Sequence, residues 1–193
     1  MRLLWLAFIL LLASCGKGPA EPSPFLAPEA DASAYAKDFR LHDAAGATRS
    51  LKDYRGKVVV LFFGYTHCPD VCPTTLGDMA VAMKQLGTSA AKVQVLFVTL
   101  DPARDTPQLL NGYVPAFNAS FIGLRGTDAE TAQAAAGFKA VYRRHPQSDG
   151  SYSIDHSANS YVFDRDGRLR LILPYGQPPA DIVHDLRILL QGA

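Results

Sequence analysis

Cysteine is scarce in this sequence, which contains only Cys15, Cys68 and Cys72. A small scaffold stapled by disulfides is therefore excluded, because such chains carry many paired cysteines. An excess of one charge is also missing, since 19 Lys and Arg stand against 18 Asp and Glu. Nucleic-acid-binding proteins usually show a basic excess or patch, so that class is not indicated. No internal repeat is visible, and a hydrophobic fraction of 48% in 193 residues favours one domain with short extensions.

The N-terminus has the features of a targeting segment. Met1-Arg2 is a short positive region, and the apolar run 3–12 is too short to span a bilayer, which takes roughly 20 residues. The run ends in Leu-Ala-Ser-Cys15, which resembles the lipobox of bacterial lipoproteins. We expect residues 1–14 to be a lipoprotein signal peptide and Cys15 to carry lipid. The protein would then be anchored to a membrane on the periplasmic, extracytoplasmic side. An ordinary secretory signal followed by an incidental cysteine is the alternative.

A change of composition follows the targeting segment. Residues 15–38 hold several prolines among Ala, Ser, Glu and Gly, which is typical of a semi-extended tether. The sequence therefore predicts a lipid-anchored tether over 15–38 and a folded domain over 39–193.

Buried strands and capped helices are indicated along the folded part. Runs of β-branched and aromatic residues predict strands at 58–63 and 93–100. Capping residues and periodicity predict helices at 74–86, from 107, from 128 to about 143, and at 179–190. Turn residues predict hairpins within 39–57 and between 160–163 and 169–173. The order hairpin, β, α, β, α, α, β, β, α predicts a thioredoxin-like α/β fold, with a central mixed sheet flanked by helices on both faces.

The segment from Gly64 to Pro73 contains the two cysteines that could bind a metal or react. Cys68 and Cys72 are four residues apart at a strand-to-helix turn, where backbone N–H groups favour thiolate. Two nearby thiolates can form a Cys68–Cys72 disulfide or share a soft metal ion, and spacing alone does not choose. The three intervening residues differ from the C-x-x-C redox motif, and a closed zinc site usually has four protein ligands. A purely structural disulfide is a further alternative.

Three segments resemble the Sco (SenC) family of copper proteins, which serve cytochrome c oxidase assembly. They are Phe63-Gly-Tyr-Thr-His-Cys-Pro-Asp-Val-Cys-Pro73, Val98-Thr-Leu-Asp-Pro-Ala-Arg-Asp-Thr-Pro107 and Asp155-His156-Ser157, and the resemblance extends over 39–190. It implies that Cys68, Cys72 and His156 bind one copper ion, as Cu(I), Cu(II) or both. Thiolates suit Cu(I), and imidazole accepts either oxidation state. The implied partner is the copper subunit of a haem–copper oxidase, with other periplasmic copper carriers or thiol reductants.

The remaining polar residues near these segments receive weaker assignments. Asp155 is either a hydrogen-bonding partner that orients His156 or a loop cap, and Asp101 to Asp105 form either a docking surface or a structural turn. We expect His67 to point away from the thiols. The other histidines are expected at the surface: His42, His145 and His184.

Three functions fit this set of residues. The first is a copper chaperone that delivers one ion to the dinuclear CuA centre during oxidase assembly, which would not be an enzyme. The second is a thiol–disulfide oxidoreductase that keeps the oxidase cysteines reduced, with Cys68 and Cys72 as its catalytic pair and no need for His156. The third is a copper or redox sensor.

Overall fold

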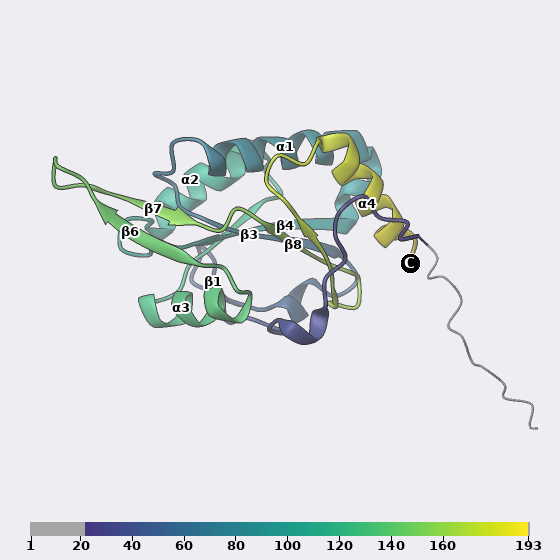
Figure 1. The fold of residues 1–193 in the computed structure, drawn as a ribbon, viewed down its shortest axis with the longest axis horizontal. Coiled ribbons are helices and arrows are strands. Elements are labelled where there is room, and N and C mark those ends of the chain that lie inside the picture. Colours follow the sequence, from purple (N-terminus) through teal and green to yellow (C-terminus); the bar gives the residue numbers. More distant parts are fainter. Residues whose placement is uncertain (1–21, 193) are drawn as a thin grey trace, which may run out of the picture.

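A five-stranded mixed β-sheet forms the centre of the structure, a computed structural model that describes residues 22–192 (Figure 1). The strands lie in the order β5-β4-β3-β8-β9. The first three are parallel to one another, and β8 and β9 are antiparallel additions. Their bounds are β3 (Val58–Gly64), β4 (Val93–Thr99), β5 (Ile122–Leu124), β8 (Ser160–Phe163) and β9 (Leu169–Leu173). The predicted mixed sheet is confirmed.

The central strand β3 is buried on both faces, as its unbroken apolar run predicts. Val58, Val60 and Phe62 contact one cluster of the core, and the alternate residues of the strand contact the other. Because successive side chains of a strand point to opposite faces, both faces of the sheet must be covered by other elements.

Helices cover both faces of the sheet (Figure 1). Helices α1 (Val71–Leu86), α2 (Pro107–Phe117) and α4 (Pro179–Gln191) lie on one face, and α3 (Asp128–Gly137) lies on the other. Short 3-10 turns η1 (Ala32–Ala34), η2 (Leu51–Tyr54) and η3 (Gly87–Lys92) complete the helical elements. The predicted caps are present. The hydroxyl of Thr106 accepts from the N–H of Leu109, and Thr127 forms a capping box with Glu130.

Two small hairpins lie outside the central sheet. β1 (Leu41–His42) pairs with β2 (Thr48–Arg49), as predicted for the region before the first long strand. β6 (Tyr142–Pro146) pairs with β7 (Tyr152–His156) and forms a separate two-stranded sheet. This β6–β7 hairpin projects from the body as an arm (Figure 1).

The structure corrects several boundaries. Helix α1 begins at Val71 rather than at residue 74, which places Cys72 in its first turn. Helix α3 ends at Gly137 rather than near residue 143, because the chain turns at Lys139 with φ 54° and then becomes β6. Strand β5, an edge strand of only three residues, was not predicted from the sequence.

The segment from Phe25 to Asp38 was assigned to the tether, and this assignment is wrong. Phe25 and Ala27 are buried in the core. The backbone N–H groups of Leu26 and Ala27 each donate to the carboxylate of Asp185 in α4, at 2.8 Å. The folded domain therefore begins near residue 25 rather than 39. The composition suggested a free tether because small residues and proline are also common in an extended segment that packs along the surface of a domain.

The predicted signal peptide and Cys15 lie outside the described residues. Within residues 22–192, no helix is both long and apolar enough to cross a membrane.

Candidate metal centre

Three potential ligands from distant parts of the chain meet at one end of the sheet. The sulfurs of Cys68 and Cys72 and a ring nitrogen of His156 all lie within 4.8 Å of one another. Cys68 lies in the loop after β3, Cys72 in the first turn of α1, and His156 at the last position of β7. The structure thus brings together the three residues that the sequence singled out for copper.

The two cysteines differ in exposure. Cys72 is fully buried, whereas Cys68 is only half-buried, so the centre opens to solvent on the Cys68 side. The backbone N–H of Cys72 points to the sulfur of Cys68 at 3.5 Å. This contact comes from the early start of α1, whose first N–H groups have no partner within the helix.

The close approach of α1 to β3 depends on Gly64. A Cβ atom at this position would lie 2.7 Å from the Cys72 sulfur and 2.9 Å from a ring carbon of Phe97. Only glycine therefore lets the first turn of α1 sit against the end of β3.

The imidazole of His156 is oriented so that its Nε2 faces the thiols. Its Nε2 lies 3.4 Å from the Cys72 sulfur, and its Nδ1 lies 2.9 Å from the carbonyl oxygen of Ser157. A carbonyl only accepts hydrogen bonds, so Nδ1 carries a proton and Nε2 is the ring nitrogen that faces the thiols and is placed to bind a metal ion. The imidazole also contacts the rings of Phe62 and Tyr65, at centroid distances of 6.1 and 6.0 Å.

The two thiols share one proton in the metal-free state. The hydrogen bond from Cys72, together with those from His156 and from backbone N–H groups, holds the pKa of Cys68 well below its usual range. The same bond to Cys68, with burial, raises the pKa of Cys72. In the metal-free state this hydrogen bond therefore favours a thiolate at Cys68 and a thiol at Cys72.

Asp155 does not contact the imidazole of His156. Adjacent strand residues point to opposite sides, so its carboxylate is 77% exposed and pairs instead with Nε2 of His145 at 2.9 Å. The carbonyl of Ser157 occupies the orienting position that was considered for Asp155.

The other histidines are near the surface, as expected. His67 is half exposed, lies 3.7 Å from Asp105 and is not one of the three clustered ligands. His42, His145 and His184 are likewise 40–46% exposed.

Asp101 and Asp105 are both fully buried, which favours the structural interpretation of these two residues. Asp105 accepts hydrogen bonds from Thr66 and from the hydroxyl of Thr99. It therefore connects the cysteine loop to the end of β4.

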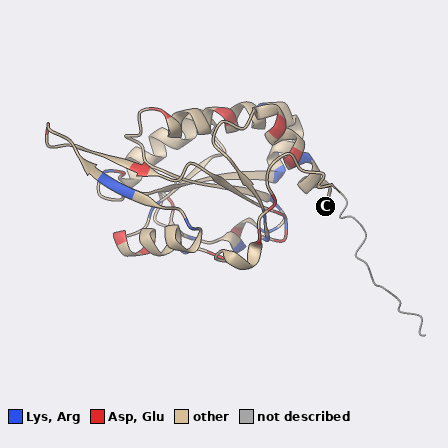
Figure 2. Ribbon diagram, in the orientation of Figure 1, with Lys and Arg blue, Asp and Glu red and all other residues tan. Residues whose placement is uncertain are grey.

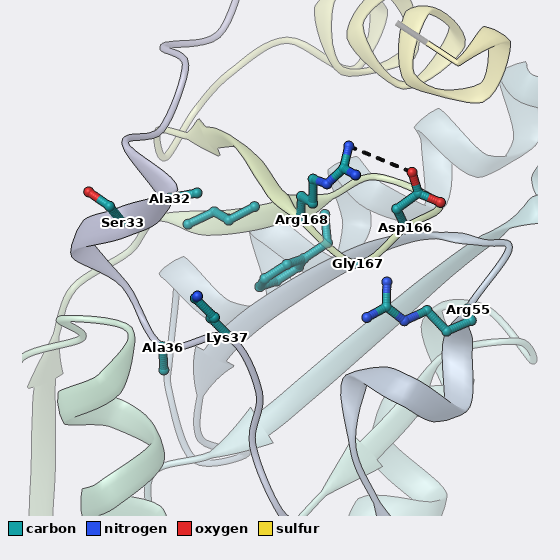
Figure 3. Close-up of a pocket in the computed structure, with 10 residues that line it drawn as sticks. Ala32, Ser33, Ala36, Lys37, Arg55, Asp166, Gly167 and Arg168 are labelled. Atoms are coloured by element: carbon teal, nitrogen blue, oxygen red, sulfur yellow. Dashed lines mark ion pairs between the residues drawn. The ribbon is translucent and has the colours of Figure 1, made fainter.

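An open cavity of about 370 Å³ lies beside Cys68 and His156 and gives access to the centre. A larger cavity of about 650 Å³ lies elsewhere, between the N-terminal segment and the β8–β9 turn, where Lys37, Arg55 and Arg168 line it (Figure 3). None of the three candidate ligands borders this larger cavity, so its size does not mark the chemical centre.

Charge is distributed unevenly around the centre. Figure 2 shows basic residues on β6, where Arg143 and Arg144 lie side by side in the sequence. The β6–β7 hairpin therefore carries two adjacent arginines on β6 and the candidate ligand His156 on β7.

The donor set fits copper better than a closed zinc site. Two sulfurs and one imidazole are soft and borderline ligands suited to Cu(I). Structural zinc sites are almost always closed by four ligands, and the described residues supply three here. The two free thiols can also be oxidised to a disulfide.

Fold and centre together define a thioredoxin-like domain with a two-cysteine, one-histidine site. The SCO1/SenC family model matches residues 27–191, and the chain belongs to this family. The mitochondrial SCO2 homologue of Bos taurus is 38% identical over 133 residues, covering 67% of this chain and 50% of that protein. A SCO2-like protein of Rickettsia felis is 32% identical over 152 residues, covering 78% of this chain and 74% of that protein. The copper-bound structure of Bradyrhizobium japonicum ScoI matches with a TM-score of 0.75 at 37% identity, covering 81% of this chain and 100% of that one.

Proposed function

We propose that this protein binds one copper ion through Cys68, Cys72 and His156 and delivers it during assembly of a haem–copper oxidase. The observation that carries the proposal is the convergence of two sulfurs and one imidazole nitrogen within 4.8 Å. A copper-bound structure of the related ScoI supports copper as the metal.

The geometry suits an ion that is cargo rather than a permanent cofactor. Three protein ligands leave one side of a copper ion open, and the cavity beside Cys68 lets an acceptor approach that side. Transfer then proceeds by exchange: acceptor ligands bind the open side, and Cys68, which is more exposed than Cys72, is released before it. The acceptor we propose is the dinuclear CuA centre of the oxidase copper subunit. The matched region covers half the length of the bovine relative, so the partner and the delivery activity are proposals of their own.

Copper titration tests the binding step. The reduced protein is titrated with Cu(I) in competition with a chromophoric Cu(I) chelator, beside a variant with both Cys68→Ser and Cys72→Ser. We expect one tightly bound ion in the parent and none in the double variant. Tight binding of one ion without either sulfur would contradict the proposal. His67→Ala is the matched control, since His67 is adjacent in sequence but outside the cluster.

A second candidate function is thiol–disulfide reduction of the oxidase cysteines. It is favoured by the hydrogen bond that keeps Cys68 as a thiolate next to a thiol. Cys68 attacks the partner disulfide to give a mixed disulfide, and Cys72 then displaces the partner thiol and closes the Cys68–Cys72 bond. Two electrons and the one proton of Cys72 pass to the partner, and the second proton of the reduced partner comes from solvent. His156→Ala separates the two functions: if CuA assembly survives this change but not Cys68→Ser, reduction is the main role.

We further propose that residues 1–14 are a cleaved lipoprotein signal and that Cys15 carries the lipid anchor, with a tether that ends near residue 25. The Leu-Ala-Ser-Cys pattern supports this proposal. Labelling cells with an alkyne-bearing fatty acid tests it, because label is expected on the parent and not on Cys15→Ser. Label on the variant would overturn the anchor assignment.

A further inference from the structure

The β6–β7 hairpin has no backbone hydrogen-bond ladder to the central sheet, although it carries one of the three ligands. A two-stranded hairpin alone is marginally stable in water. The position of His156 therefore depends on side-chain contacts between the hairpin and the body of the domain.

Alternate residues of β7 make those contacts. Because side chains repeat every two residues along a strand, Tyr152, Ile154 and His156 share one face. Ile154 is buried in the core, and its backbone N–H donates to the hydroxyl of Tyr65 at 3.2 Å. The remaining residue, Tyr152, forms hydrogen bonds with Asp101 and Arg104 in the body of the domain.

Asp101, Arg104 and Tyr152 form a closed ring of hydrogen bonds. The Nε of Arg104 donates to one carboxylate oxygen of Asp101. The Nη1 of Arg104 donates to the backbone carbonyl of Tyr152 at 2.9 Å. The hydroxyl of Tyr152 donates to the other carboxylate oxygen of Asp101 at 2.7 Å. The guanidinium carbon also lies 3.6 Å from the centroid of the Tyr152 ring, which adds a cation–π contact.

The ring of contacts is sheltered from solvent. Asp101 is fully buried and Arg104 is 23% exposed. Charge-assisted hydrogen bonds with little solvent exposure are stronger than surface ion pairs. By contrast, Arg144 approaches Asp101 only to 3.8 Å and is 43% exposed.

We propose that Arg104 is a positioning residue for copper binding, which clamps Tyr152 and thereby holds His156 against the cysteines. This inference rests on the proposed function, because it assumes that His156 is a ligand. Arg104 touches none of the three ligand residues in the described structure. It acts through β7 and through the Tyr65 ring, whose centroid lies 5.8 Å from its guanidinium carbon and which contacts the imidazole of His156. Without the clamp, the hairpin samples positions in which Nε2 of His156 lies away from Cys72.

A double-mutant cycle in Cu(I) affinity tests the inference. Arg104→Met is expected to weaken Cu(I) binding about tenfold, the lower end for residues that orient a metal ligand. In the His156→Ala background the same substitution should change affinity little. An equal loss in both backgrounds, or no loss in the parent, would overturn the positioning role. If His156→Ala alone leaves affinity unchanged, the proposed three-ligand site fails instead, so the two failures are distinguishable.

Two further variants keep the test independent of folding. Tyr152→Phe removes only the hydroxyl that donates to Asp101, and it should weaken Cu(I) binding in the parent but not in His156→Ala. Arg144→Met is the comparison variant. Its guanidinium lies 3.8 Å from Asp101 and 5.3 Å from the Tyr152 ring centroid, and its side chain is 43% exposed, so these contacts are longer than those of Arg104 and we expect affinity to change by less than about twofold. An effect of Arg144→Met as large as that of Arg104→Met would overturn the assignment to the clamp. Circular dichroism at the assay temperature checks that each variant is folded.

Discussion

Asp105 accepts two hydrogen bonds from Thr66, one from the backbone N–H at 3.0 Å and one from the hydroxyl at 2.6 Å. Its carboxylate is fully buried and also receives the hydroxyl of Thr99. Thr66 lies two residues before Cys68, so this contact fixes the start of the cysteine loop relative to β4.

Replacing Asp105 with asparagine is therefore expected to destabilise the fold. The amide keeps one acceptor oxygen and carries no charge, so at least one of the three charge-assisted hydrogen bonds is lost or replaced by a neutral one, at a cost of about 1–3 kcal/mol in the free energy of unfolding. Urea unfolding of the metal-free protein measures the change. Asp155→Asn serves as control, because its carboxylate is 77% exposed and should change stability by less than about 0.5 kcal/mol. Equal stability of Asp105→Asn and the parent would contradict the role of this contact.

Gly64→Ala is expected to disturb the centre through packing. The added Cβ would lie 2.7 Å from the Cys72 sulfur, so either the sulfur or the first turn of α1 must shift. Overpacking of this kind costs about 1–3 kcal/mol of stability, and Cu(I) affinity should fall as well. Gly77→Ala in α1 is the matched control, because nothing lies within 4 Å of its Cβ position. That control should stabilise the helix by up to about 1 kcal/mol.

The pH dependence of thiol reactivity follows from the shared proton. In the reduced, metal-free protein the hydrogen bond from Cys72 lowers the pKa of Cys68, so Cys68 remains a reactive thiolate in mildly acidic solution. Cys72→Ala removes that bond, and the pKa of Cys68 should rise. Alkylation by iodoacetamide, followed from acid to alkaline pH, should show a rate profile displaced upward in pH for the variant. Superimposable profiles would contradict the proposed proton sharing.

The long buried strands, the capped helices and the 160–173 hairpin were predicted from sequence because their signals are local. The β6–β7 hairpin was missed because the alanine-rich helix pattern runs into Tyr142–Pro146, a polar strand that packs little apolar surface. His156 lies 84 residues from Cys72, and only the family resemblance connected the two. No local sequence pattern indicates the hydrogen bond from Arg104 to Tyr152, because these residues are 48 positions apart and meet only when the β6–β7 hairpin packs against the body of the domain.

The N-terminal segment gives a further prediction. Asp185 receives the N–H groups of Leu26 and Ala27, so Asp185→Asn should weaken the attachment of residues 22–28 to α4. Amide hydrogen exchange in this segment is expected to accelerate while exchange in β3 and β4 changes little. Asp181→Asn, one turn earlier in α4, should leave exchange in the segment unchanged. Acceleration in both variants would argue against a specific role for Asp185.

With the lipid anchor proposed above, the attachment at Asp185 would also determine which end of the domain points away from the membrane. The described chain begins beside the end of α4, and the β6–β7 hairpin lies at the opposite end of the molecule (Figure 1). A protein held by its N-terminus would therefore present the hairpin forward, away from the point of attachment. The distance from the membrane to the hairpin would then be the length of the tether plus the long dimension of the domain. That distance favours acceptor sites that project from the bilayer over sites at its surface.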